Sequence, residues 1–203
     1  MWREIDPGDF VTVVSGLPRS GTSMMMQMLE AGGIPALTDG ARPANEDNPR
    51  GYYELERVKQ VRHDKEWVAQ AHGRAVKVIS SLLCELPAGH RYKVVFMRRR
   101  MPEVLASQRA MLERRGEVAA AQADDEAMAR RLASHLREVE GELARRPDMQ
   151  VLEVWYHEVV EDPAGQAARI AAFLEGRANP AAMARACDRT LWRQRSPGGG
   201  EAR

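Results

Sequence analysis

Residues 11–30 read VTVVSGLPRSGTSMMMQMLE, and this stretch decides the fold. The β-branched run Val11–Val14 predicts a buried strand, a turn with two glycines follows it, and the Met- and Leu-rich residues after Thr22 predict a helix. In such a turn Gly16 and Gly21 let successive backbone N–H groups point inward, and the start of the helix adds the positive end of its dipole. The stretch therefore predicts a binding site for an anion such as a phosphate.

The spacing of the two glycines is close to G-x-x-x-x-G-K-[ST], the loop that binds nucleoside triphosphates together with Mg²⁺. Thr22 stands where that loop has its lysine, and a basic residue comes three positions earlier as Arg19. The lysine of that loop reaches the terminal phosphates, whereas an arginine inside the turn offers a planar fork of donors to an anion above it. The substitution predicts a phosphate ligand other than a Mg²⁺-bound triphosphate.

Three further apolar runs predict strands at residues 75–79, 93–97 and 151–155. Helical patterns at about 103–115 and 124–145 separate the later strands. Strands that alternate with helices predict an α/β fold of the P-loop type, a three-layer sandwich with a parallel sheet flanked by helices. In such folds ligands bind at the carboxyl ends of the strands.

Length and composition predict one domain over residues 1–203, because 203 residues with 44% hydrophobic side chains are enough for a single core. Within it, the polar and irregular segment of about 34–75 follows the glycine turn, and we expect it to face the substrate. Residues 196–203 include three consecutive glycines and are expected to form a flexible tail.

Composition also bears on the partners of the protein. A formal net charge of +1 lacks the basic excess of a nucleic-acid-binding protein, so no nucleic-acid partner is expected. Apolar runs fall short of the roughly 20 residues that cross a bilayer, so no membrane span is expected. The two cysteines, Cys84 and Cys187, lack metal-ligand spacing, and the N-terminus does not read as a secretory leader. These features predict a reduced, cytoplasmic protein.

The run 93–97 ends in Arg98-Arg99-Arg100, where a Mg²⁺-dependent nucleoside triphosphatase would carry an acidic residue for the metal. A basic strand end suits a second phosphate on the ligand better than a metal ion. Taken alone, three arginines also fit a solvated corner of the molecule.

Three motifs resemble those of the sulfotransferase family. Residues 16–23, GLPRSGTS, resemble the 5′-phosphosulfate-binding loop P-[KR]-S-G-T-[ST]. RRRMPEVLASQ resembles the 3′-phosphate signature R-x-P-x-D-V-x-x-S at Arg99 and Ser107, with Pro102 displaced by one position and Glu103 in place of Asp. A third stretch, YHEVVEDP followed by FL, resembles Y-E-D-L-x-x-D-P with F-L-G and bears on the fold alone.

The resemblance implies an enzyme that uses 3′-phosphoadenosine 5′-phosphosulfate (PAPS) as donor and needs no metal. It assigns to donor binding the residues Pro18, Arg19, Ser20, Gly21, Thr22, Ser23, Arg99 and Ser107, together with Arg193 and Arg195 of a basic C-terminal segment. Arg19 would also be catalytic, because it would stabilise charge on the leaving phosphate. Lys77, in the second predicted strand, is a further candidate contact for the transferred group.

The base that accepts the proton of the acceptor is assigned to Glu54, because NPRGYYE resembles an N-P-x-G-[YF]-x-E stretch of bacterial sulfotransferases. Glu46, Asp47, His63 and Asp64 remain alternatives. The acceptor is expected to be a hydroxyl or amine of a small molecule or glycan, and the oligomeric state is open.

Two other functions fit parts of the sequence. A kinase with a displaced basic residue is one, because Ser23 keeps the hydroxyl that would bind Mg²⁺. A non-catalytic module that binds adenosine phosphates is the other.

Overall fold

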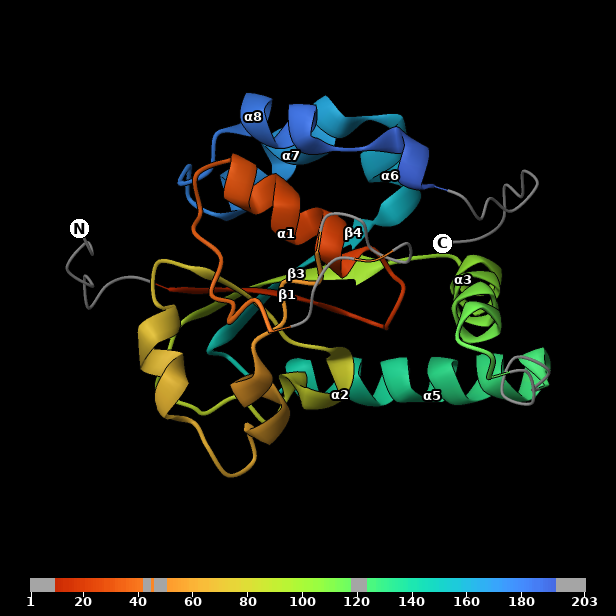
Figure 1. Ribbon diagram of the computed structural model, residues 1–203. Helices are drawn as coiled ribbons and strands as arrows, with labels where there is room; N and C mark the ends of the chain where they lie inside the picture. The colour runs from red at the N-terminus through yellow and green to blue at the C-terminus, as the bar shows by residue number, and fades with distance from the viewer. Residues whose placement is uncertain (1–9, 42–44, 46–50, 118–123, 193–203) are drawn as a thin grey trace.

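Four parallel strands form the central sheet of the computed structural model (Figure 1). The structure describes residues 10–41, 45, 51–117 and 124–192. The strands are β1 (Val11–Gly16), β2 (Ala75–Lys77), β3 (Tyr92–Arg98) and β4 (Met149–Trp155). Their order in the sheet is β2-β1-β3-β4, which confirms the predicted parallel sheet.

The position of β1 between β2 and β3 creates a switch point in the sheet. Val13 of β1 pairs with Val76 on one side and with Val94 on the other. The chain leaves β1 towards one edge of the sheet and continues from β3 towards the other edge. The crevice between the carboxyl ends of β1 and β3 is where ligands bind in open α/β sheets.

Helices cover both faces of the sheet and complete the three layers (Figure 1). One face carries α1 (Thr22–Ala31), α6 (Tyr156–Glu161), α7 (Pro163–Phe173) and α8 (Pro180–Ala186). The other carries α2 (Ser80–Leu83), α5 (Asp125–Leu143) and two 3-10 helices, η1 (Glu56–Gln60) and η2 (Glu66–Ala71). Helix α3 (Met101–Arg114) follows β3 beyond the edge of the sheet, and η3 (Arg189–Leu191) lies near the end of the described chain.

Each face of the sheet has its own hydrophobic core. Successive residues of a strand point to opposite faces, so Val14 packs under α1 while Val11 and Val13 pack against the other helical layer. These side chains are inaccessible to solvent. Burial of each contributes on the order of 1.5–3 kcal/mol.

The segment 34–75 is mostly part of the second core. Val58, Val61, Trp67 and Val68 are buried there, and Ala36 forms a parallel bridge with Ala75 at the edge of the sheet. Tyr52 and Glu54 lie near the start of α1, where both contact Lys77. Residues 196–203 lie outside the described residues.

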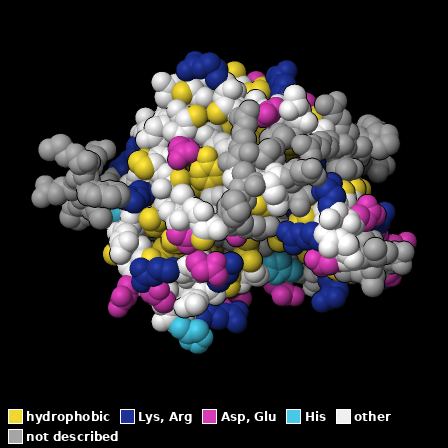
Figure 2. Space-filling view, viewed as in Figure 1, with side chains coloured by type: hydrophobic (Ala, Val, Ile, Leu, Met, Phe, Trp, Pro, Cys, Tyr) yellow, Lys and Arg dark blue, Asp and Glu magenta, His cyan; other side chains and the backbone are white. Residues whose placement is uncertain are grey.

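Acidic and basic side chains are intermingled on the face seen in Figure 2, in keeping with the small net charge of the chain. Among the described helices, none combines the length and the hydropathy that crossing a bilayer requires.

Candidate active site

The turn between β1 and α1, residues 16–23, begins at the switch point of the sheet and is called the glycine turn below. Gly16 and Gly21 have φ of 141° and 102°, and Arg19 has φ of 71°, a left-handed conformation that costs a non-glycine residue about 1–3 kcal/mol. A Cβ on Gly21 would lie 2.4 Å from Cδ2 of Tyr156. The turn is therefore held in a shape that only glycine permits at this position.

Two arginines and a serine meet beside the glycine turn. Nε of Arg19 donates a hydrogen bond to Oγ of Ser107 on α3, at 3.0 Å. Nη1 of Arg99 donates to the backbone carbonyl of Arg19, at 3.1 Å. Arg19, assigned to the 5′-phosphosulfate, thus contacts both Arg99 and Ser107, which are assigned to the 3′-phosphate. The three residues form one cluster.

Arg99 is fixed by further contacts. Its Nε donates to Oε2 of Glu103 at 3.0 Å, and its guanidinium lies 4.5 Å from the ring centre of Tyr156. The same Glu103 oxygen accepts a hydrogen bond from Nε1 of Trp192, at 3.1 Å. The sequence indicates Arg99 but not this support, although the i,i+4 spacing of Arg99 and Glu103 at the start of α3 is a signal that could have found it.

Arg98 points elsewhere, although it belongs to the same basic run. Its guanidinium pairs with Glu153 of β4 and Glu140 of α5. Arg98 is the last residue of β3, whereas Arg99 lies beyond the strand and contacts the backbone of Arg19.

Buried hydroxyl and amide groups near the glycine turn lack partners within the described part of the chain. Oγ of Ser20, a residue only 1% exposed, has no hydrogen-bond partner there. The same holds for both amide atoms of Gln27, one helical turn after Ser23. Buried polar atoms are nearly always bonded in folded proteins, so an orphaned hydroxyl in this turn is a position where a ligand oxygen fits.

A second group of polar residues lies on the other side of the start of α1. Nζ of Lys77, at the end of β2, donates to the carbonyl of Tyr52, lies 3.4 Å from Oγ of Ser23 and lies 3.8 Å from Oε1 of Glu54. The Lys77 side chain is 7% exposed, while that of Glu54 is 25% exposed. Lys77 therefore connects an accessible carboxylate to the glycine turn.

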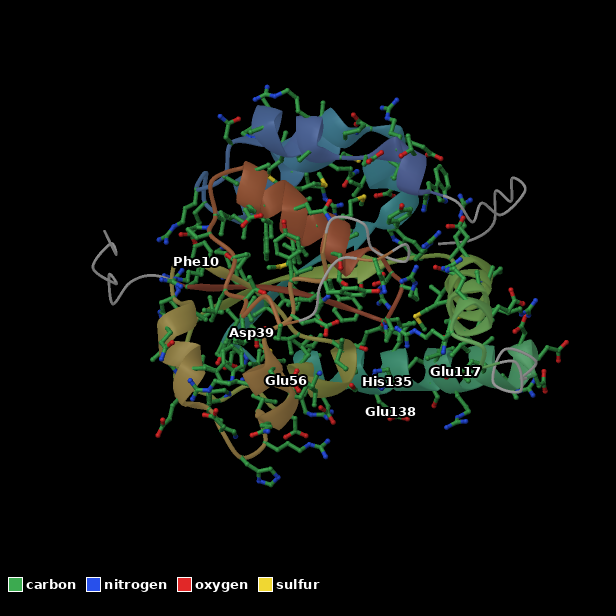
Figure 3. All side chains as sticks on the ribbon, in the orientation of Figure 1. Phe10, Asp39, Glu56, Glu117, His135 and Glu138 are labelled. Carbon is green, nitrogen blue, oxygen red and sulfur yellow. The ribbon has the colours of Figure 1, made fainter. Side chains whose placement is uncertain are left out.

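The backbone around Glu54 is anchored by residues 38 and 39. The carbonyl of Glu54 accepts a hydrogen bond from Oγ1 of Thr38 at 2.7 Å, and the backbone N–H of Glu56 donates to Oδ2 of Asp39 at 2.6 Å. Figure 3 shows Asp39 and Glu56 close together. The N–H of Glu56, followed by that of Ala41, lowers the pKa of Asp39, so this anchor stays charged at neutral pH.

Part of the chain matches a known family. The model of a sulfotransferase family matches residues 90–179, a range that includes Arg99, Ser107 and Tyr156. This segment is therefore similar to the sulfotransferase family.

Two solved sulfotransferase domains resemble the chain in structure. The domain from the curacin biosynthetic pathway aligns with a TM-score of 0.51 and 12% sequence identity, over 96% of this chain and 94% of that one. The domain from the Synechococcus PCC 7002 olefin synthase aligns with a TM-score of 0.48 and 18% identity, over 98% and 94%. The first likeness shows that the chain has the fold of a sulfotransferase domain. No curated protein sequence matches the chain.

Several of the site residues predicted from the sequence fall into two groups in space. Arg19, Arg99 and Ser107 form the first group, and Ser23, Lys77 and Glu54 form the second. Pro18 is exposed on the glycine turn, next to the half-buried Arg19. The two C-terminal residues Arg193 and Arg195 lie outside the described residues.

The candidate alternatives to Glu54 are placed differently. Asp64 accepts two hydrogen bonds from Arg57, and His63 is exposed on the loop beside it, whereas Glu46 and Asp47 lie outside the described residues. Within the described chain, no group of three or more His, Cys, Asp or Glu residues has the geometry of a metal site.

Proposed function

We propose that the protein transfers a sulfuryl group from PAPS to a hydroxyl or amine of a small molecule or glycan. The observation that carries the proposal is the meeting of Arg19, Arg99 and Ser107 beside the glycine turn. Two guanidinium groups and a hydroxyl, close to the N-terminus of α1, suit a ligand with two separate anionic groups. The match of residues 90–179 to a sulfotransferase family supports sulfuryl transfer as the reaction.

The residues present fit this donor. The backbone of the glycine turn and the hydroxyls of Ser20, Thr22 and Ser23 would hold the 5′-phosphosulfate, and Oγ of Ser20 is buried there without a partner in the described chain. Arg99 and Ser107 would hold the 3′-phosphate. Arg19, bonded to Ser107, lies between the two groups and would contact both.

The donor, when bound, supplies the sulfuryl group and leaves as adenosine 3′,5′-bisphosphate. Arg19 would stabilise the negative charge that develops on the leaving phosphate, because its guanidinium is permanently charged and already oriented. Removal of one such donor in comparable sites costs about 3–4 kcal/mol of transition-state stabilisation. Lys77, held next to Ser23, would neutralise the transferred group as it passes to the acceptor.

Glu54 would accept the proton of the acceptor hydroxyl. Its carboxylate is accessible to a ligand, while its backbone is fixed by Thr38 and its side chain lies 3.8 Å from Lys77. This geometry supports Glu54 over Asp64, whose carboxylate is engaged by Arg57.

Binding measurements test the choice of nucleotide. Calorimetry with adenosine 3′,5′-bisphosphate, and separately with ATP and Mg²⁺, should give tight, metal-independent binding of the bisphosphate and none of ATP. Binding of ATP that depends on Mg²⁺, without binding of the bisphosphate, would replace this proposal with a kinase.

Turnover measurements test whether the site is catalytic. Labelled PAPS with a panel of hydroxyl and amine acceptors should give a labelled product with the wild type and a much slower reaction with Glu54→Gln. Glu56→Gln is the matched control, because that carboxylate pairs with exposed Lys59 and should leave the rate unchanged. Bisphosphate binding without turnover of any acceptor would indicate a binding module instead.

A cytoplasmic location is part of the same proposal. It is supported by the two cysteines of the chain, Cys84 and Cys187, which are both described and form no disulfide.

A further inference from the structure

Glu103 is the most buried carboxylate beside the glycine turn. Its side chain is 1% exposed, and one of its oxygens accepts hydrogen bonds from Nε of Arg99 and from Nε1 of Trp192. A buried carboxylate is costly unless it is paired and hydrogen-bonded. Arg99, which precedes α3, and Trp192, 89 positions after Glu103, both donate to this carboxylate and offset that cost.

We propose that Glu103 is a positioning residue that makes the site selective for nucleotides with a 3′-phosphate, by fixing the guanidinium of Arg99. Trp192 completes this arrangement by holding Glu103 from the C-terminal side. The inference rests on the proposed function, because it takes Arg99 as the residue that contacts the 3′-phosphate.

Within the described chain, three contacts hold the Arg99 guanidinium in its plane and direction. Glu103 fixes the Nε edge, the carbonyl of Arg19 fixes Nη1, and the ring of Tyr156 lies against the guanidinium. An arginine side chain carries roughly 2 kcal/mol of rotamer entropy, which is lost when it binds a ligand. An arginine that is already ordered loses little more on binding, so pre-ordering increases affinity for the group it contacts.

Of these three contacts, the one with Glu103 is the one that a side-chain substitution can remove with the least effect on the rest of the fold. The Arg19 contact is made by the backbone, and Tyr156 also packs in the core and beneath Gly21. Glu103→Gln keeps the size of the side chain but removes the charge that orients Nε. The guanidinium would then lose its preferred direction while the glycine turn keeps its shape.

Trp192 connects this arrangement to the end of the described chain. Its ring lies edge-on to that of Tyr156, with 6.3 Å between ring centres, while its N–H is bonded to Glu103. Nη2 of Arg189, three residues earlier, donates to the carbonyl of Glu161 at 3.3 Å. The segment 189–192 is thus docked against α6, and Trp192→Phe would remove the N–H donor while keeping a ring in place.

A pair of nucleotides separates positioning from a general structural role. Adenosine 3′,5′-bisphosphate and adenosine 5′-monophosphate differ only in the 3′-phosphate, and calorimetry gives a dissociation constant for each. We expect Glu103→Gln to weaken bisphosphate binding roughly tenfold or more and to leave monophosphate binding unchanged. Glu103→Asp, which restores the charge on a shorter side chain, should recover part of the loss.

Two further variants complete the design. Glu153→Gln removes the carboxylate that pairs with the neighbouring Arg98 and should leave the ratio of the two affinities unchanged. Trp192→Phe should lower the ratio by a smaller factor than Glu103→Gln, and it tests the same contact if Glu103→Gln does not fold.

Three results would overturn the inference. Equal weakening of both nucleotides in Glu103→Gln would mean that Glu103 acts on the fold as a whole. An unchanged ratio in both Glu103→Gln and Trp192→Phe would mean that it does not orient Arg99. A wild type without preference for the bisphosphate would overturn the proposed function itself, and the inference with it.

Discussion

The side chain of Arg19 donates a hydrogen bond from Nε to Oγ of Ser107, 88 positions away in the sequence and 3.0 Å away in space. This bond joins the glycine turn to α3 and brings the residue assigned to the 5′-phosphosulfate next to one assigned to the 3′-phosphate. The two partners should therefore have different kinetic effects.

Replacing Arg19 by Ala should lower kcat about 10²–10³-fold, because the charge on the leaving phosphate loses a preorganised donor. Ser107→Ala should mainly raise the KM for PAPS, since a hydroxyl at the 3′-phosphate contributes to binding before and during the reaction alike. Steady-state kinetics with PAPS as the varied substrate separates the two effects. Equal losses of kcat in both variants would contradict this division of roles.

Gly21→Ala should destabilise the protein more than Gly33→Ala does. Both glycines have a positive φ, but a Cβ on Gly21 would meet the Tyr156 ring, whereas a Cβ on Gly33 has no atom within 4 Å. We expect an excess loss of about 1–3 kcal/mol in the free energy of unfolding, from overpacking against a buried ring. Urea unfolding of the two variants measures the difference, and equal losses would show that the ring moves aside.

Gln27→Met should stabilise the ligand-free protein. Both amide atoms of Gln27 are buried without a partner in the described chain, so an apolar side chain of similar size removes a desolvation cost of about 1–3 kcal/mol. Gln150→Met is the control, since Oε1 of Gln150 accepts a hydrogen bond from Lys93 at 2.8 Å and its loss should destabilise. Thermal unfolding of both variants tests this, and a lower Tm for Gln27→Met would show that the amide is bonded.

Stability should fall as the pH drops below about 6.5. Nε2 of His72 lies 2.8 Å from Nδ1 of His90; burial lowers the pKa of both rings below the usual 6.5, and for His90 the charge of His72 adds to this. The unfolded chain then binds protons at a higher pH than the folded chain does. The stability that the neutral pair of rings contributes is fully present above pH 6.5. It is lost as the pH falls from there through the lowered pKa values of the folded protein.

Urea unfolding between pH 5 and 7.5 measures this dependence. His90→Gln should show a smaller fall in the free energy of unfolding over that range than the wild type, because it removes one titrating ring and the repulsion on the other. A steeper fall in the variant would contradict the direction of the shift.

Much of the fold and part of the site follow from local sequence. The strand, glycine turn and helix of residues 11–31 are specified by β-branched residues, two glycines and a helical apolar pattern, all within 21 positions. Arg99 and Ser107 could be paired as candidates because RRRMPEVLASQ resembles the 3′-phosphate signature of sulfotransferases. Hydrophobic periodicity depends on neighbours in sequence, so it is readable without the structure.

Only the tertiary structure shows which side chains hold the predicted site residues in place. The sequence could not show that Arg98 turns to Glu153 while Arg99 turns to Glu103, nor that Trp192 reaches the same carboxylate. Nor could it show that the packing of the sheet edge brings Lys77 beside Glu54. Such contacts join residues tens of positions apart, and which of them form depends on how whole strands and helices pack, which no local pattern encodes.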